Sequence, residues 1–147
     1  MTTIRFETSD APHVRLSECL SGLTITGHDA SQVILEVDGR ESDVTARREG
    51  ETITVSARRD CYLTCPFNAT LSVQQVLGRL RVRNVEGTLT VETVMGDVSL
   101  RQVGTVSIQT AHGDIEARHV KGPLTLKQVN GDMRLRQIEG QFTLEQG

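Results

Sequence analysis

The sequence predicts an all-β fold in which the chain winds as a β-solenoid with coils of about 18 residues. Three observations support this prediction. Glycines recur every eight or nine residues in the second half, at positions 78, 87, 96, 104, 113, 122, 131 and 140. Apolar and polar residues alternate between these glycines, which is the period of a β-strand. Aromatic residues make up only 3% of the chain, so a narrow core of Val, Leu and Ile is expected.

The repeat has two alternating halves. The first half reads Gly-Asp-apolar-x-apolar-Arg-x-apolar, and its copies begin at Gly96, Gly113, Gly131 and, with Arg79 in place of Asp, at Gly78. The second half reads Gly-x-apolar-Ser/Thr-apolar, and its copies begin at Gly87, Gly104, Gly122 and Gly140. Each half predicts a short strand followed by a two-residue bend. Its glycine supplies either a backbone conformation that other residues avoid or a close approach to the next coil.

Stacked coils predict ladders of equivalent side chains, one rung about every 4.8 Å. On one wall the inward ladders are Leu80/Val98/Ile115/Met133, Val82/Leu100/Ala117/Leu135 and Val85/Val103/Val120/Ile138. On the other wall they are Leu89/Val106/Leu124/Phe142 and Val91/Ile108/Leu126/Leu144. An outward ladder is expected at Thr90/Ser107/Thr125/Thr143. The prediction fails if Val98, Ile115 and Met133 lie far apart.

The first half of the chain is less regular. Alternation predicts strands over residues 22–27, 32–37, 51–56, 61–65 and 69–73, with turn signals between them. These strands form either irregular early coils or a small antiparallel sheet that caps the solenoid. The charged segment 40–51 is expected to be an exposed loop or a hairpin end. No linker is evident, so one domain is predicted over 1–147, with an irregular cap over 1–77 and four regular coils over 78–147.

Charge and hydropathy restrict the partners and the location. The net charge is −3 and the isoelectric point is near 5.8, which does not favour nucleic acid or an anionic membrane. No run approaches the ~20 apolar residues of a membrane span, and the start has no signal-peptide pattern. The sequence as given therefore predicts a cytoplasmic protein without membrane insertion. A place at the cell envelope or surface is expected if an anchor or signal has been removed.

The cysteines and the aspartates are the candidate metal ligands of the sequence. Cys61 and Cys65 would lie ~13 Å apart in a strand, too far for a disulfide, and they are expected to face inward as small apolar side chains. A metal site at this pair has weak support. Asp97, Asp114 and Asp132 suggest calcium, but the Gly-Gly of calcium-binding nonapeptide repeats is missing. Each aspartate is expected to accept a hydrogen bond from turn backbone instead, so no metal or cofactor is predicted.

The candidate interaction face is a ladder of Arg83, Arg101, Arg118 and Arg136. Four aligned guanidinium groups suit an acidic polymer such as an anionic polysaccharide. The alternative is a solvated face neutralised by Glu86, Glu116 and Glu139.

No catalytic residues are predicted. Nucleophile-elbow and zinc-protease motifs are absent, and His28, His112 and His119 are expected to be ordinary surface residues. Residues 140–147 stop within a repeat and carry no polar cap. Either the last coil docks on another copy of the chain, end to end or edge to edge, or the chain was cut there, or the final strand is short enough to tolerate water.

Residues 22–27 (Gly-Leu-Thr-Ile-Thr-Gly), a following hydrophobic strand, Val55, Pro66 and the successive Gly-Asp units resemble a bacterial family of β-helical domains, the putative-adhesin family of unknown function. The resemblance covers roughly residues 14–147 and implies a right-handed β-helix. Members of the family often carry a membrane anchor or signal, and the resemblance brings no catalytic residues. We therefore expect a non-enzymatic structural or interaction module that self-associates through its ends. The alternative is a polysaccharide-binding or carbohydrate-active protein that uses the arginine face. The expected partners are the chain itself, a polysaccharide or a protein.

Overall fold

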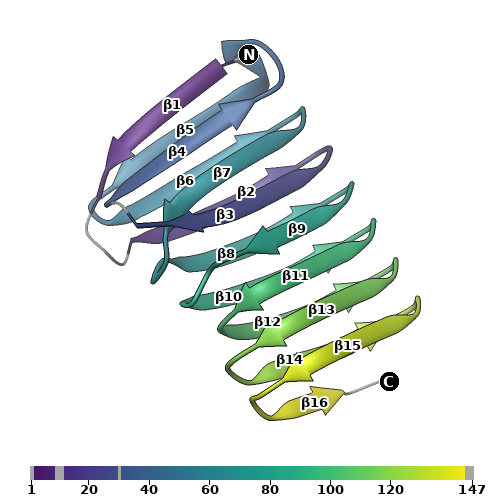
Figure 1. Ribbon diagram of the computed structural model, residues 1–147. Coiled ribbons are helices and arrows are strands. Elements are labelled where there is room, and N and C mark those ends of the chain that lie inside the picture. Colours follow the sequence, from purple (N-terminus) through teal and green to yellow (C-terminus); the bar gives the residue numbers. More distant parts are fainter. Residues whose placement is uncertain (1, 9–11, 30, 145–147) are drawn as a thin grey trace.

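The computed structural model describes residues 2–8, 12–29 and 31–144, which form two sheets of eight strands each (Figure 1). Sheet A has the order β1 (Thr2–Glu7), β4 (Gln32–Val37), β7 (Cys61–Pro66), β3 (Leu23–His28), β9 (Leu80–Arg83), β11 (Val98–Val103), β13 (Ile115–Val120) and β15 (Met133–Ile138). Sheet B has the order β16 (Phe142–Leu144), β14 (Leu124–Val129), β12 (Thr105–Ala111), β10 (Thr88–Val94), β8 (Thr70–Val76), β2 (His13–Cys19), β6 (Thr52–Ala57) and β5 (Val44–Glu49). A short 3₁₀ helix, η1 (Glu41–Asp43), precedes β5. The all-β class is as predicted.

From β8 onward the chain alternates between the two sheets. We call a strand of sheet B and the sheet A strand that follows it a layer, such as β8–β9 or β10–β11. Successive layers pair in parallel, and Val98 lies opposite Ile115, which lies opposite Met133. On the other wall, Leu89 lies opposite Val106, and Val106 lies opposite Leu124. The stacking of equivalent residues that the repeat predicts is therefore present.

The core is a slim aliphatic band between the sheets. Side chains along the strands alternate between buried and exposed, and the inward ones from both sheets form one hydrophobic cluster. The inward side chains of the last two strands, β15 and β16, are less buried than the repeat predicts. Met133, Leu135 and Ile138 are only partly buried, while Phe142 and Leu144 remain 40% and 37% exposed. The reason is geometric, because no described strand pairs with the outer edges of β15 and β16.

The repeat glycines permit close approach of neighbouring layers. A Cβ atom at Gly104 would lie 2.2 Å from the carbonyl oxygen of Glu86, and one at Gly96 would lie 2.5 Å from that of Gly78. Among the described glycines, only Gly50 has a positive φ. The left-handed conformation falls instead on the second bend residue, at Asn84 (φ 60°), Gln102 (53°), His119 (59°) and Gln137 (55°). Of the two roles expected for these glycines, the structure thus selects the close approach.

The layers of the first half do not follow the order of the sequence. β2 lies between β6 and β8, and β3 lies between β7 and β9, all in parallel. Layer β2–β3 is therefore inserted between β6–β7 and β8–β9 (Figure 1). The sequence analysis did not predict β1, β2 or β5. Val14, Leu16 and Cys19 of β2 are fully buried.

The remaining strands of the first half form antiparallel pairs. These pairs are β1–β4, β4–β7 and β5–β6. The predicted segments 22–27, 32–37, 51–56, 61–65 and 69–73 correspond to β3, β4, β6, β7 and β8. Segment 40–51 contains η1 and β5, and β5 pairs with β6 across Gly50, so the segment is a hairpin rather than a loop. None of the helices in the described ranges could cross a bilayer.

Candidate functional site

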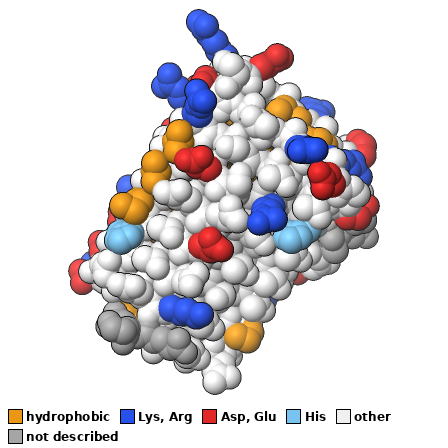
Figure 2. Space-filling view, turned by 180° about the vertical axis from the view of Figure 1, so that it is seen from behind, with side chains coloured by type: hydrophobic (Ala, Val, Ile, Leu, Met, Phe, Trp, Pro, Cys, Tyr) orange, Lys and Arg blue, Asp and Glu red, His pale blue; other side chains and the backbone are white. Residues whose placement is uncertain are grey.

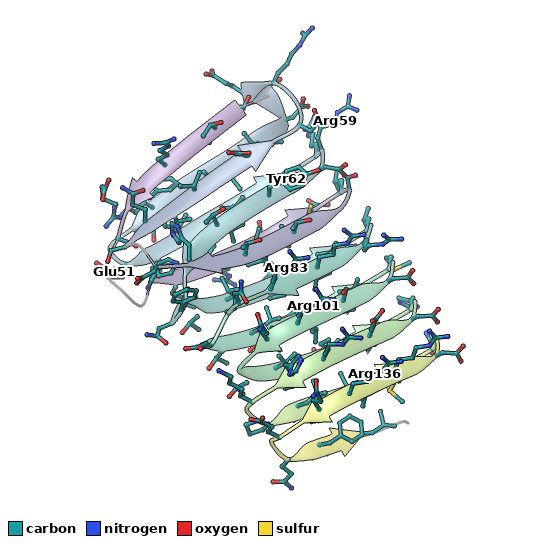
Figure 3. The ribbon with its side chains drawn as sticks, viewed as in Figure 1. Glu51, Arg59, Tyr62, Arg83, Arg101 and Arg136 are labelled. Carbon is teal, nitrogen blue, oxygen red and sulfur yellow. The ribbon has the colours of Figure 1, made fainter. Side chains whose placement is uncertain are left out.

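The predicted arginines form one unbroken row on the outer face of sheet A. Arg83, Arg101, Arg118 and Arg136 lie in register on β9, β11, β13 and β15. We call them the arginine row; the same line continues through Thr26 of β3 to Thr64 of β7. Figure 3 labels three of these arginines, Arg83, Arg101 and Arg136, on β9, β11 and β15. Neighbouring rungs are ~4.8 Å apart, which is the spacing of strands in a sheet.

A second row of outward side chains runs beside the first. It contains Tyr62 of β7, Thr24 of β3, Arg81 of β9, Ser99 of β11, Glu116 of β13 and Arg134 of β15, and we call it the mixed row. Tyr62 is the single tyrosine of the chain, and it is 44% exposed. The prediction for this strand from the sequence concerned only its inward cysteines and did not include Tyr62.

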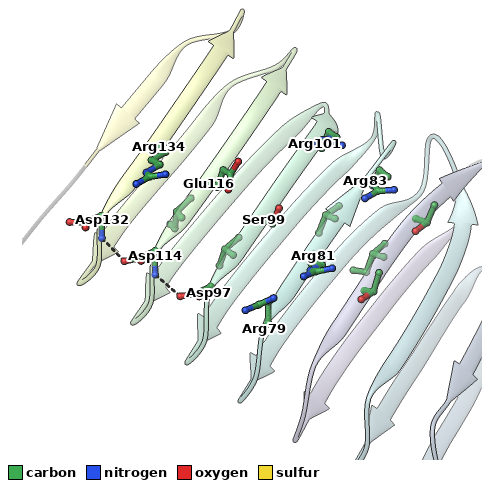
Figure 4. A pocket seen from close by; sticks show the side chains of 16 residues that line it. Arg79, Arg81, Arg83, Asp97, Ser99, Arg101, Asp114, Glu116, Asp132 and Arg134 are labelled. Carbon is green, nitrogen blue, oxygen red and sulfur yellow. Dashed lines mark hydrogen bonds between the residues drawn. The ribbon is translucent and has the colours of Figure 1, made fainter.

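A hollow of ≈ 580 Å³ lies over β3, β9, β11, β13 and the start of β15 (Figure 4). The arginines that line it are Arg79, directly before β9, Arg81 and Arg83 of β9, Arg101 of β11 and Arg134 of β15. Four carboxylates line it as well, those of Asp97, Asp114, Glu116 and Asp132. Arg118 and Arg136 are not part of this lining. Arg83 and Arg101 were predicted from the sequence, whereas Arg79, Arg81 and Arg134 were not. For Arg79 and Arg81, the alternation of arginine with Leu80 and Val82 was the available signal, because a period of two places them on the same face as Arg83.

The arginines of this face are not neutralised by ion pairs within the described part of the chain. The ion pairs there are Lys121–Glu86 at 3.4 Å and Arg47–Glu49 at 3.5 Å. Glu86, one of the three glutamates named in the solvated-face alternative, is thus engaged by Lys121. Aligned cations without paired anions create a positive potential that attracts anionic ligands.

The aspartates at the rim of the hollow bind backbone, as predicted. Asp97 Oδ1 accepts a hydrogen bond from the backbone N–H of Asp114 at 3.0 Å, and Asp114 Oδ1 accepts one from Asp132 at 2.8 Å (Figure 4). At the same corner of layer β6–β7, Asp60 accepts hydrogen bonds from the Ser21 hydroxyl and from the Gly22 N–H. These two bonds hold the pKa of Asp60 below its usual value. Within the described ranges, no three acidic, His or Cys side chains come together as ligands for a metal ion.

The cysteines lie in the core. Cys61 and Cys65 face inward with Leu63, as predicted, and both are free thiols, as is the buried Cys19. Burial raises the pKa of Cys61 and of Cys65 to about 12. The thiolate is the nucleophilic form, so these side chains act as apolar packing groups at neutral pH.

The three histidines considered in the sequence lie apart, His28 at the end of β3, His112 between β12 and β13, and His119 within β13. The ring of His28 hydrogen-bonds the Gln32 carbonyl through Nε2 at 2.9 Å, and that of His112 contacts Asn130 Nδ2 through Nδ1 at 3.1 Å. His119 has a left-handed backbone and lines a second hollow, of ≈ 390 Å³, with Glu86 and Lys121.

The outer face of sheet B has a different character. Its centre is the predicted ladder of Thr90, Ser107, Thr125 and Thr143, which lie in register. Figure 2 shows the molecule from this side, where uncharged polar side chains and backbone dominate and charged groups are scattered. The arginine-bearing face of sheet A is therefore the stronger candidate for a charged ligand.

Solved structures provide the comparisons for this chain. A putative cell adhesion protein from Clostridium sporogenes matches with a TM-score of 0.55 and 12% identity, over 99% of each chain. A putative adhesin from Bacteroides fragilis matches with a TM-score of 0.36 and 12% identity, over 99% of this chain and 96% of its own. No family model and no curated protein matches the sequence. What the Clostridium protein shares with this chain is the fold.

Proposed function

We propose that this chain is a non-enzymatic interaction module, a right-handed β-solenoid forming one domain over residues 1–147 and related to the putative-adhesin family. It acts at the cell envelope or surface and associates with a second copy through the end formed by β15 and β16. The observation that carries the proposal is the uncovered end of the core, where Phe142 and Leu144 are 40% and 37% exposed. The resemblance of the Gly-Asp units and the fold of the Clostridium cell adhesion protein support the family and the location.

The scaffold suits a binding role because its surface is regular. Parallel ladders hold equivalent residues of successive layers in register, so each outward side chain has a fixed position relative to its neighbours. Such repeat architectures commonly use their extended faces for binding. A module of this kind needs no catalytic group, and its function depends on which faces a partner covers.

The end at β15 and β16 supports self-association. Exposed edge strands offer unpaired backbone N–H and C=O groups to a further strand. A second copy that pairs there also covers Met133, Leu135 and Ile138, which are only partly buried. A two-fold arrangement brings the same apolar patch of each copy together and closes as a dimer. The opposite edge of sheet B, strand β5, carries exposed charges at Arg47, Arg48 and Glu49, which oppose strand addition.

The mass in solution tests this association. Light scattering over a range of concentrations is expected to give the mass of a dimer for the native chain. The variant Phe142→Glu is expected to give the mass of one chain, because a carboxylate in the contact disfavours burial. Leu77→Glu is the matched control, since Leu77 is 41% exposed at a lateral turn. A one-chain mass for the native protein at high concentration would overturn the association.

A second measurement tests the absence of catalysis. The competing function is a carbohydrate-active enzyme that cleaves a polysaccharide along sheet A. Incubation with acidic polysaccharides is expected to release no new reducing ends and no unsaturated products. Release that is lost on replacing Arg81 and Arg83 would contradict the non-enzymatic role.

A further inference from the structure

We propose that the hollow on sheet A over β3, β9 and β11 is a binding site for a linear acidic polysaccharide, a chain of uronate or sulfated sugars. The site lies on the outer face of sheet A, and its arginines at β9 and β11 are two or more strands away from β15, although Arg134 of β15 also lines the hollow. It differs from the four-arginine ladder of the sequence, because its cations are centred at β9, on Arg79, Arg81 and Arg83.

The cations provide the charge that such a ligand needs. Alternate residues of a strand are ~6.6 Å apart, which places Arg81 and Arg83 in a line along β9, and Arg79 lies directly before the strand. Arg101 flanks Arg83 on the next strand. None of the four has an ion pair with another described residue. A guanidinium group can bind a carboxylate or sulfate through two parallel hydrogen bonds, and these four are free to do so.

Hydroxyl groups flank the arginines on both sides. Thr24 and Thr26 of β3 lie in register with Arg81 and Arg83, and Ser99 of β11 lies in register with Arg81. All three line the hollow and are partly exposed. Hydroxyl side chains both donate and accept, which matches the hydroxyls of a sugar ring. The volume of ≈ 580 Å³ is within the usual range of small-ligand pockets, so it can hold part of a sugar chain.

Tyr62 supplies an apolar surface at one end of the site. It lies in the mixed row beyond Thr24, two strands from Arg81, which corresponds to ~9.6 Å. Its ring is 44% exposed on the same face as Arg83 and Arg101 (Figure 3). The apolar face of a pyranose packs on such a ring, so a chain that crosses the strands can stack at Tyr62 and place its acidic groups on the arginines.

The surroundings favour a polysaccharide over other polyanions. Single-stranded nucleic acid stacks successive bases on several aromatic side chains, and this face offers one. A protein partner usually covers an apolar centre, whereas the polar side chains that line this hollow are guanidinium groups, carboxylates and hydroxyls. The carboxylates of Asp97, Asp114, Glu116 and Asp132 lie toward the later layers, where Arg134 also lines the hollow. The arginines are closest together at β9, so the acidic groups of the ligand are expected to bind there.

Calorimetric titration with defined polymers tests the site. Polygalacturonate and dextran sulfate are the acidic probes, neutral dextran is the uncharged one, and oligo-dT and polyglutamate represent the other polyanions. We expect one or both acidic polysaccharides to bind, neutral dextran to show no heat, and the other polyanions to bind at least about tenfold more weakly. Equal affinity for oligo-dT or polyglutamate would overturn the assignment. The absence of measurable binding heat with both acidic polysaccharides would also overturn it.

Matched variants locate the site. The double variant Arg81→Gln/Arg83→Gln is expected to weaken polysaccharide binding by at least about tenfold, since it removes two charge-assisted contacts. Tyr62→Ala is expected to weaken it several-fold. The control is Arg15→Gln, an exposed arginine on the outer face of sheet B, and it should leave the affinity unchanged. An equal loss in the control, or no loss in either site variant, would refute the site. The mass by light scattering stays the same in all of them, so this test is independent of self-association.

Discussion

Asp97 of one layer is hydrogen-bonded to the backbone of Asp114 in the next, with 3.0 Å between Asp97 Oδ1 and the Asp114 nitrogen. Asp114 makes the same contact to Asp132 at 2.8 Å. These bonds tie the layers together at the corner where the chain passes from sheet B to sheet A. The same contact joins layer β6–β7 to layer β2–β3, where Asp60 Oδ1 accepts a hydrogen bond from the Gly22 N–H at 3.0 Å. Arg79 occupies the equivalent position in layer β8–β9 and has no carboxylate, so a cation that lines the hollow lies there instead of an acceptor.

Replacing Asp114 with alanine is expected to lower the free energy of unfolding by about 1 kcal/mol, the usual net contribution of a hydrogen bond. Asp114→Asn keeps a side-chain oxygen as acceptor, so it should cost less. Chemical denaturation measures both. Glu92→Ala, at an exposed position of β10, is the control and should have little effect. A loss as large in the control as in Asp114→Ala would contradict a specific role for the bond.

Gln102→Gly is expected to raise the free energy of unfolding by about 0.5 kcal/mol. Gln102 has a φ of 53°, a left-handed conformation that costs a non-glycine residue about 1–2 kcal/mol, and this relief exceeds the entropy that glycine adds to the unfolded chain. Gly104→Ala is expected to have the opposite sign, with a loss of about 1–3 kcal/mol, because its Cβ would lie 2.2 Å from the Glu86 oxygen. Thermal denaturation compares the two. Destabilisation by Gln102→Gly would show that the bend is not strained.

The stability of the protein is expected to fall in acid partly through Asp60. Its pKa is lowered in the folded state by the Ser21 hydroxyl and the Gly22 N–H, so its contribution is complete above the unfolded pKa of about 3.9. That contribution is lost as the pH falls through the lower folded pKa. Urea unfolding should therefore give a higher free energy of unfolding for the native protein than for Asp60→Asn at pH 7. The difference between the two free energies should disappear below about pH 4. Glu92→Gln serves as a control, and a gap independent of pH would contradict the assignment.

The cysteines are expected to resist thiol reagents in the folded protein. The pKa of Cys61 and of Cys65 is raised to about 12 by burial, and burial also raises that of Cys19, so little thiolate exists at pH 8. Titration with a chromogenic disulfide should detect no fast-reacting thiol before urea is added and all three afterwards. Leu20→Cys, placed at a 40% exposed turn position, should react at once. Fast labelling of the native chain would mean that the core opens readily.

The stacking within residues 78–144 could be predicted from the sequence because local signals repeat there. A period of two, a glycine at each corner and a fixed spacing together define which residues stack, as Val98 and Ile115 do. Strand β2 was missed because it carries no glycine in that spacing. Its position between β6 and β8 depends on pairing over long sequence separations, which no local pattern encodes. The exposure of Phe142 likewise depends on what lies beside β16, not on its own alternation.

The candidate site was predicted in part for a similar reason. Comparing equivalent positions of successive coils found Arg83 and Arg101, which stack across strands. Arg81 lies in the same strand as Arg83 and Arg79 lies directly before it, so a comparison between coils overlooked them. Tyr62 joins the face only because β7 and β9 flank β3, and that neighbourhood follows from the order of the layers.

That order also has a consequence for how the chain folds during synthesis. Strands β2 and β3 leave the ribosome before both of their flanking layers, β6–β7 and β8–β9, which must later close around them. Pairings of such high contact order slow folding. Strands β2 and β3 cannot complete their pairing until residue 83, the last residue of β9, has left the ribosome. The remaining layers can then form one at a time, each pairing with the layer already folded, so the assembly of the first layers is the slowest step of folding.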